Sequence, residues 1–397
     1  MKSRPALLGL LALFLAAAGG SAGAAPRADA ADATPDVVKP TAAKQRGPST
    51  LDPSLSRAAD RLLRGAKPVE GAIVVIDPRT GRVLAFEAVT SGAGSFQVLT
   101  QARMPAASLF KVVTTTALFE STSLSPHDSV CINGGVHGIE RRHLEPARGP
   151  SRQCGAFAWA LGHSKNAVFA QLATRLLTRD DLLKTAERLG FNDKLSLDDG
   201  EQEAELGKLS VPYNDLEFAR AAAGFQGSSL SPLGAAYLMT LIARGGAPVG
   251  LRLHDASPTP EPSGALPAAP PFSPRTAQRL TRMLEVTVET GTSRKAFTAP
   301  DGKRYLPGIR VAGKTGTLRP EQREDAMTSW FVGFAPSRSP ELVVSVMLVN
   351  GRTYRRKANE LARDLLRTYF RAHGHSQSIT DPFTEGAAEP LAAAAAR

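Results

Sequence analysis

Gly313-Lys314-Thr315-Gly316-Thr317 is the stretch that decides the fold, because its letters fit two unrelated kinds of site. With Gly308 in front, it reads G-x-x-x-x-G-K-T, which is the pattern of a phosphate-binding loop. Read from Lys314 onward, Lys-Thr-Gly is instead a motif of serine enzymes that acylate themselves. The rest of the chain has to decide between a nucleotide site and an acyl-transfer site.

The residues after Lys314 argue against a nucleotide site. A phosphate-binding loop needs a helix that starts at its lysine, so that the N–H groups of the first helical turn can hold phosphate. Here Leu318-Arg319-Pro320 follow, and a strand-like segment comes next, at residues 328–334. A proline at this distance does not begin such a helix well. We therefore expect no nucleotide as a ligand.

Residues 1–24 have the features of a secretory signal peptide. Lys2 and Arg4 precede an apolar run at residues 6–18, small residues follow, and cleavage is expected after Ala24. The alternative is an uncleaved anchor, although the run is short for a helix that crosses about 30 Å of hydrocarbon. In both cases we expect the remainder to be exported, to the periplasm or the outer face of the cytoplasmic membrane.

Length and composition allow one large domain or two modest ones, between flexible ends. Of 397 residues, 42% are hydrophobic, which is enough for a substantial core. We expect a flexible linker at residues 25–60, a folded domain at 61–375 and a disordered tail at 376–397. The net charge of +11 indicates anionic surroundings such as the cell wall. Because the chain is exported and has no basic run, nucleic acid is not expected as a partner.

Cys131 and Cys154 are the two cysteines of the chain. In an exported protein such a pair is most simply a disulfide. His137 and His143 lie between them, so a Cys-His-His-Cys zinc site is an alternative, and free thiols are another. The spacing matches none of the compact zinc knuckles. The prediction is a disulfide, with no metal and no cofactor.

Apolar segments predict a sheet built from both ends of the chain. Residues 71–77 and 83–89 flank a Pro/Gly turn, as in a hairpin. Near the other end, the apolar segments at 309–312, 328–334 and 341–349 follow one another closely, as antiparallel neighbours do. About 200 residues between the two sets have Leu and Ala at helical spacing. The predicted fold class is α+β: an antiparallel five-stranded sheet covered by helices, with an inserted all-helical subdomain.

Ser108-Leu109-Phe110-Lys111 is a candidate nucleophile and base. Positions i and i+3 of a helix share a face, so the Ser108 hydroxyl and the Lys111 amine can meet. A lysine can accept the serine proton only when it is neutral, which at pH 7 means lowering its pKa from about 10.4 to about 7, or about 4.6 kcal/mol. Burial and the charge of Lys314 would both act in that direction.

A third motif is Ser164-Lys165-Asn166, which follows a helical-looking stretch at residues 157–161. The Ser164 hydroxyl could relay a proton, and the Asn166 amide could hold a substrate carbonyl. Both residues also favour helix caps, which is the alternative interpretation. The order S-x-x-K, S-x-N, K-T-G along the chain favours a common site.

With these motifs, residues 65–372 resemble the transpeptidase domain of penicillin-binding proteins. Further similarities lie at residues 77–81, 231–233, 243–246 and 329–334. By that resemblance Ser108 is the acylated nucleophile, Lys111 its base, Ser164 the proton relay and Asn166 a substrate holder. The implied reaction is attack on the penultimate D-alanine of a peptidoglycan stem peptide. Transfer to an amine makes a D,D-transpeptidase, and transfer to water makes a D,D-carboxypeptidase.

The resemblance also assigns the stretch quoted at the outset. Lys314 counts among the catalytic residues, and it would face the substrate carboxylate together with Thr315. Thr317 would contribute a backbone N–H to an oxyanion hole, with that of Ser108. At Gly316, a side chain on an edge strand would crowd the substrate. The implied partners are stem peptides, β-lactam antibiotics as covalent inhibitors, and cell-wall synthesis proteins.

Two other functions are possible for a chain with these motifs, and one feature departs from the family. A β-lactamase of the same fold is one alternative, and a non-catalytic wall-binding or sensor protein is the other. Between Asn166 and Lys314 we find no Glu-x-x-x-Asn loop for a deacylating water, which favours the penicillin-binding enzyme. Only about 45 residues separate the signal peptide from the first strand, so a stand-alone domain is expected.

Overall fold

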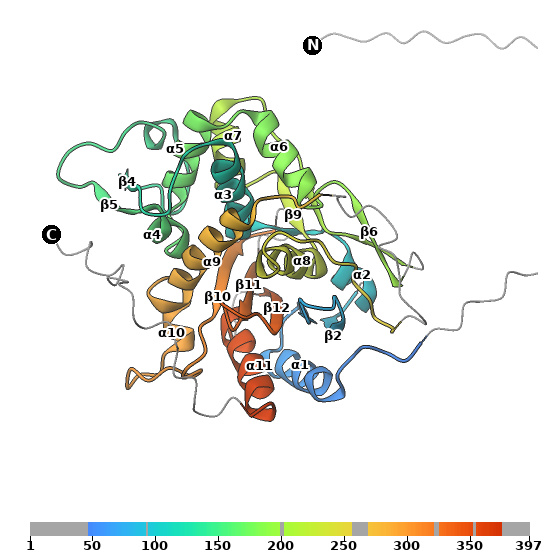
Figure 1. Ribbon diagram of the computed structural model, residues 1–397. Coiled ribbons are helices and arrows are strands. Elements are labelled where there is room, and N and C mark those ends of the chain that lie inside the picture. Colours follow the sequence, from blue (N-terminus) through green and yellow to red (C-terminus); the bar gives the residue numbers. More distant parts are fainter. Residues whose placement is uncertain are drawn as a thin grey trace, which may run out of the picture. The chain divides into compact units, whose positions relative to one another are not determined.

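A five-stranded antiparallel sheet forms the centre of the fold within the described residues, with strand order β10-β11-β12-β1-β2. The computed structural model describes residues 47–374, except 93, 199–201, 256–268, 321–324 and 352–354. In β1, Val74 lies opposite Ser345 of β12, so the first hairpin and the last strands are neighbours (Figure 1). This confirms the α+β prediction. The strands are β1 (Glu70–Ile76), β2 (Val83–Thr90), β10 (Ala312–Leu318), β11 (Met327–Ala335) and β12 (Leu342–Asn350).

Helices cover both faces of this sheet, which explains why β1 and β12 are buried along their whole length. Along β1, Ile73 and Val75 belong to one core with α1 (Pro53–Ala66) and α11 (Ala358–Ala372). Val74 and Ile76 belong to the other core, which includes α8 (Pro232–Ala243). Strands buried on both faces read as continuous apolar runs, so the sequence shows no alternation there.

The folded part begins earlier than the predicted boundary at residue 61. Residues up to 46 lie outside the described part, as do the expected signal peptide and the tail, but α1 begins at Pro53 and not after residue 60. The Asp52 carboxylate accepts hydrogen bonds from the N–H groups of Ser54 and Leu55, which caps the helix. Asp-Pro is a helix start signal that composition alone does not reveal. None of the helices in the described ranges is both long and apolar enough to cross a bilayer.

The insertion between β2 and β10 was predicted to be all-helical, and this prediction is wrong. Its described part also holds three small sheets, with strand orders β3-β9-β8, β4-β5 and β6-β7. These strands have two to four residues, which is too short for a period of two to be visible. The strands are β3 (Met104–Pro105), β4 (Ser129–Ile132), β5 (Gln153–Ala156), β6 (Lys194–Leu197), β7 (Gln202–Glu205), β8 (Gly207–Leu209) and β9 (Ser228–Leu230).

Helix α3 (Phe110–Ser121) lies at the centre of the insertion, among the other helices (Figure 1). All its residues from 110 to 119 are buried. The hydroxyls of its threonines donate hydrogen bonds to backbone carbonyl oxygens, as Thr114 does to that of Ala222. The remaining helices are α2 (Ser95–Thr100), η1 (Ala107–Leu109), η2 (Arg141–His143), α4 (Phe157–Gly162), α5 (Asn166–Leu176), α6 (Arg179–Arg188), α7 (Asp215–Ala222), α9 (Pro274–Glu289) and α10 (Arg294–Phe297).

Candidate active site

Ser108 and Lys111 meet at the start of α3. Ser108 lies in the short helix η1, and α3 continues from it, so the two side chains are one turn apart on one face. Lys111 Nζ lies 2.7 Å from Ser108 Oγ and 2.7 Å from the carbonyl oxygen of Ala223. Lys111 is fully buried, whereas Ser108 is half-buried. The nucleophile is therefore accessible to a ligand while its neighbour is shielded from water.

The surroundings of Lys111 disfavour its charged form. Burial lowers the pKa of the Lys111 amine well below its usual range, and the charge of Lys314 lowers it further. A neutral amine has a lone pair that can accept the Ser108 proton. The position of Lys111 and the downward shift of its pKa thus both suit a general base.

Lys314 links the second and third motifs. Its Nζ lies 3.1 Å from Ser164 Oγ and 2.9 Å from the carbonyl oxygen of Thr315. Lys314 is fully buried in β10, and this burial lowers its pKa to about 7. Near neutral pH, Lys314 can therefore gain or lose a proton and influence the charge on Lys111. The structure brings Ser108 and Lys111 together, and Ser164 and Lys314 together.

Two residues at these motifs have a left-handed backbone. Ala107, which precedes Ser108, has φ +50°, and Ser164 has φ +56°. Such conformations cost free energy in non-glycine residues and are concentrated at functional sites. Gly224 makes room for the first of them, since a Cβ there would lie 2.0 Å from the carbonyl oxygen of Ala107. No local sequence pattern points to Gly224, because its contact joins segments that are far apart in the chain.

In β10, Gly316 has a packing role beside the space for substrate that we predict. Gly316 is buried, and a Cβ there would meet Ala107 Cβ at 3.3 Å, Trp330 Cδ1 at 3.3 Å and the carbonyl oxygen of Ala106 at 3.4 Å. The glycine thus lets the turn that bears the nucleophile approach the strand, so it does not merely keep space for substrate. The Trp330 indole N–H donates to the carbonyl oxygen of Pro105 at 3.0 Å and holds the same turn from β11.

The other predicted substrate contacts lie around these groups. Thr317 is exposed on β10, one residue beyond Gly316. Thr315 is half-buried, and its hydroxyl oxygen lies 2.6 Å from that of Thr292. Asn166 begins α5, and its Nδ2 donates to the carbonyl oxygen of Val136 at 2.7 Å. This amide therefore has one hydrogen engaged with a loop and one left for a ligand.

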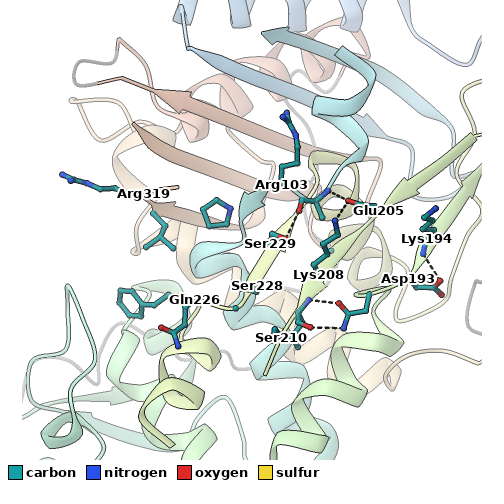
Figure 2. Close-up of a pocket in the computed structure, with 18 residues that line it drawn as sticks. Arg103, Asp193, Lys194, Glu205, Lys208, Ser210, Gln226, Ser228, Ser229 and Arg319 are labelled. Carbon is teal, nitrogen blue, oxygen red and sulfur yellow. Dashed lines mark hydrogen bonds and ion pairs between the residues drawn. The ribbon is translucent and has the colours of Figure 1, made fainter. Parts of the chain in front are cut away.

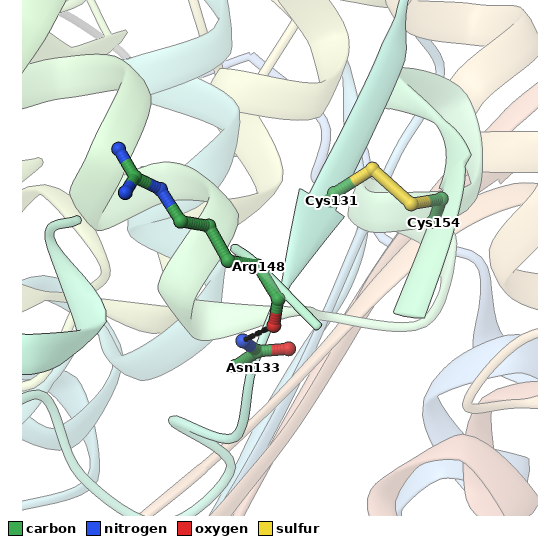
Figure 3. The surroundings of a disulfide bond; sticks show 4 residues. All are labelled: Cys131, Asn133, Arg148 and Cys154. Atoms are coloured by element: carbon green, nitrogen blue, oxygen red, sulfur yellow. Dashed lines mark hydrogen bonds between the residues drawn. A yellow bond between two sulfur atoms is a disulfide. The ribbon is translucent and has the colours of Figure 1, made fainter. Parts of the chain in front are cut away.

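The loop that contacts Asn166 is closed by a disulfide between Cys131 and Cys154 (Figure 3). The two cysteines lie opposite each other in the β4-β5 pair, and Asn133 Nδ2 donates to the carbonyl oxygen of Arg148 across the base of the loop. The buried amide of Gln171 in α5 donates to the loop carbonyl oxygens of His143 and Glu145. Since α5 begins at Asn166, the loop and the helix position each other.

We expect the Cys131→Ser, Cys154→Ser double variant to be less stable by roughly 3 kcal/mol, because the unfolded chain loses the restraint on a loop of this length. Urea denaturation of the oxidised protein and of the variant measures the difference. Reducing the wild-type protein should lower its stability by a similar amount and leave the variant unaffected. Equal unfolding free energies would show that the contacts with α5 hold the loop without the disulfide.

A cavity of about 750 Å³ lies between the end of β10 and the β3-β9-β8 sheet (Figure 2). Its wall includes Pro105, which is three residues before Ser108, and Leu318 and Arg319, which follow Thr317. Lys208 lines the cavity with its ammonium group 2.9 Å from the Glu205 carboxylate. The lining residues come from segments that are distant in sequence, so no sequence motif predicts the cavity.

Comparison with known proteins places most of the chain in one family. Residues 71–367 match the family model described as the penicillin binding protein transpeptidase domain. The peptidoglycan D,D-transpeptidase PbpA of Mycobacterium tuberculosis is 24% identical over 347 residues, which cover 76% of this chain and 67% of that protein. The stage V sporulation protein D of Bacillus subtilis is 26% identical over 254 residues, 61% of this chain and 38% of that one.

Solved structures have the same fold. The D,D-transpeptidase domain of a peptidoglycan glycosyltransferase from Eggerthella lenta has a TM-score of 0.66 and 24% identity, covering 82% of both chains. The ceftriaxone acyl-enzyme complex of penicillin-binding protein A from M. tuberculosis has a TM-score of 0.63 and 21% identity, covering 82% of this chain and 79% of that one. At these identities the likeness shows the fold alone.

Proposed function

Since this chain belongs to the penicillin-binding protein transpeptidase domain family, we propose that it is a serine D,D-transpeptidase acting on peptidoglycan stem peptides. The observation that carries the proposal is the contact between Ser108 Oγ and the buried Lys111 amine, at 2.7 Å. A curated relative named as a peptidoglycan D,D-transpeptidase matches three quarters of the chain. A serine beside a neutral amine is suited to acyl transfer through a covalent intermediate.

The proposed reaction begins when Ser108 Oγ attacks the carbonyl carbon of the penultimate D-alanine. Lys111 Nζ takes the hydroxyl proton, and the backbone N–H groups of Ser108 and Thr317 stabilise the oxyanion. The C–N bond then breaks, and the amine of the terminal D-alanine leaves with a proton delivered through Ser164. An amine, or water, next attacks the Ser108 ester, gives up a proton and restores the free serine.

Lys314 and Thr315 would hold the carboxylate of the terminal D-alanine. An anion beside Lys314 favours its protonated form, although burial alone lowers its pKa to about 7. Burial lowers the pKa of Lys111, and a protonated Lys314 would lower it further. Substrate binding would thus prepare the base for its task.

The cavity in Figure 2 would receive the part of the donor stem peptide that precedes the reacting D-alanine. Its lining includes Leu318, the last residue of β10, which follows Thr317 in the chain. A peptide with its carboxylate at Thr315 and its carbonyl at Thr317 would continue into this space. Acylation should therefore be faster with a long donor than with D-alanyl-D-alanine alone, and equal rates would refute this assignment.

We also propose that the protein is exported, with or without cleavage of residues 1–24. The disulfide supports this location, because structural disulfides persist in oxidising compartments. The net charge of +11 suits a wall rich in anionic groups. Recovery of the protein without detergent, followed by N-terminal sequencing, separates a cleaved signal from an anchor, and recovery only from the cytoplasm would exclude export.

A labelled penicillin tests the proposed function. We expect one adduct per chain by intact mass, located on Ser108 by peptide mapping, and none on a Ser108→Ala variant. Equal labelling of both proteins would refute the assignment of the nucleophile. Rapid turnover of a chromogenic β-lactam would indicate a β-lactamase, and no acylation would indicate a non-catalytic wall-binding protein. Incubation of a stem peptide with an amine acceptor then separates crosslinked from hydrolysed product.

A further inference from the structure

The loop that joins β4 to β5, residues 133–152, carries an excess of positive charge, and we call it the arginine loop. It contains four arginines and two glutamates. The imbalance continues along the chain, because residues 146–179 contain four arginines, one lysine and no acidic residue. In Figure 1, β4 and β5 lie at the left edge of the fold, beside α4 and α5. A surface of one sign is therefore expected at this edge.

Most cations of the arginine loop have no acidic partner. Arg141, Arg148 and Arg152 are exposed, and within the described ranges none of the three forms an ion pair. Arg142 does form one, since its guanidinium lies 3.0 Å from the Glu140 carboxylate, and both of these side chains are exposed. Exposed cations without a carboxylate beside them are available to an anionic ligand.

Two cations from outside the loop are bonded to it and extend the positive surface. Lys165 Nζ lies 3.2 Å from Oε1 of Gln153, the residue that follows the loop, and 4.7 Å from the centre of the Trp159 ring. The Arg175 guanidinium of α5 donates to the carbonyl oxygen of Leu144 at 3.2 Å. Both hydrogen-bond partners are neutral, so both cations keep their full charge at this surface.

The arginine loop is anchored to the helices beside it. Ile139 is buried, and its carbonyl oxygen accepts a hydrogen bond from the Arg220 guanidinium of α7 at 3.0 Å. Gly135 has φ +72°, and a Cβ there would lie 2.8 Å from Ala167 Cβ in α5. Together with the disulfide, these contacts fix the position of the loop against α5 and α7. Charges that are held in place bind a ligand at a lower cost in entropy than charges on an unrestrained chain.

The arginine loop borders the second motif, where the proposed reaction brings the acceptor amine. The carbonyl oxygen of Val136 accepts a hydrogen bond from Asn166 Nδ2 at 2.7 Å, and Asn166 lies two residues after Ser164. In the proposed reaction Ser164 passes a proton to the amine that leaves. The amine that enters reverses this step: it bonds to the acyl carbon, the ester bond to Ser108 breaks, and the amine proton returns to the serine oxygen. The acceptor therefore reaches the ester beside Ser164, with the loop next to it.

We propose that the arginine loop is the docking surface for the acyl acceptor, and that it binds the carboxylates of an acceptor stem peptide. The inference rests on the proposed function. A stem peptide that ends in D-alanine carries a negative charge at neutral pH. Exposed ion pairs are individually weak and are screened by salt, so several arginines have to act together. The loop thus favours an anionic acceptor over a neutral one.

The test uses three variants that differ in charge and in place. The first variant removes three charges from the loop by Arg141→Gln, Arg148→Gln and Arg152→Gln. The second variant replaces the same three arginines with lysine, which keeps the charge. The control removes the same number of charges from exposed residues of α1 and α11, which pack on the other face of the sheet, by Arg57→Gln, Arg61→Gln and Arg371→Gln.

Crosslinked product is measured against the concentration of an amine-bearing peptide that ends in a single D-alanine, and of its carboxamide. For the loop glutamine variant we expect the acid concentration that gives half-maximal crosslinking to rise about fivefold. The value for the carboxamide and the rate of acylation by penicillin should each change less than about twofold. The lysine variant and the control should match the wild-type protein. Added salt should weaken the wild-type response to the acid and change that of the glutamine variant little.

An unchanged requirement for the acid in the loop glutamine variant, or an equal change in its control, would overturn the inference. A wild-type protein that is acylated but yields only hydrolysed product at every acceptor concentration overturns the inference alone. A wild-type protein that penicillin does not acylate refutes the proposed function, and the inference with it. If the loop glutamine variant keeps the acceptor response and instead loses binding to vesicles of anionic phospholipid, the surface faces a membrane and the inference is wrong.

Discussion

Replacing Lys111 with alanine is expected to slow acylation of Ser108 by about a thousandfold or more. The substitution removes the buried amine that lies 2.7 Å from Ser108 Oγ and is placed to accept the serine proton. A Lys111→Met variant should lose the same factor while it fills the space of the lysine stem. Reaction with a fluorescent penicillin, followed in time, measures the rate constants.

The same experiment has a signature in pH. Lys111 acts as a base only when it is neutral, so wild-type acylation should rise with pH through its lowered pKa and then level off. Both Lys111 variants should lose that rising limb. Lys184→Ala is the control, since this exposed lysine of α6 forms a surface ion pair with Asp180. If a variant without Lys111 acylates within tenfold of the wild-type rate and its rate still rises with pH in the same way, another group is the base.

Replacing Gly224 with alanine is expected to destabilise the fold by about 3 kcal/mol and to slow acylation by about a hundredfold. The residue has φ +81°, and the added Cβ would lie 2.0 Å from the carbonyl oxygen of Ala107 and 3.4 Å from the Ser108 nitrogen. These are backbone atoms, so no side-chain rotation relieves the contact. The nucleophile and its N–H group must therefore move.

Gly245→Ala separates the two parts of this effect. Gly245 also has a left-handed backbone, with φ +70°, but an added Cβ would meet no atom within 4 Å. We expect it to cost only about 1 kcal/mol, with normal acylation. Urea denaturation and penicillin acylation of both variants measure the difference. Equal losses in the two variants would mean that backbone conformation, and not the contact with Ala107, sets the requirement for glycine.

Much of the sheet could be predicted because its strands are local patterns. The hairpin of β1 and β2 and the closely spaced β10, β11 and β12 are each visible as apolar runs between turns. The small strands of the insertion were missed. Met104 of β3 pairs with Leu230 of β9, so its partner is more than a hundred residues away, and a two-residue strand has no period of its own.

For the same reason, only some residues of the candidate site could be predicted from the sequence. Ser108 and Lys111 are one helical turn apart, so their contact follows from spacing. Gly224 and Thr292 lie far from the motifs in sequence and contact them only in the folded chain. A role for glycine at position 316 was predicted from the sequence. The close contacts of this position with Ala106, Ala107 and Trp330 arise only in the folded chain.

The sequence by itself determined which groups can do the chemistry. The spacing of residues within short motifs predicted Ser108, Lys111, Ser164 and Lys314 as the site residues. The residues that follow Lys314 predicted that the stretch from Gly313 to Thr317 is not a phosphate-binding loop, and it is a strand in the structure. Only the tertiary structure decided that the pKa of Lys111 lies well below its usual range, since the pKa of an amine depends on how completely water is excluded from it. That exclusion comes from side chains of many separate segments, and no stretch of sequence contains it.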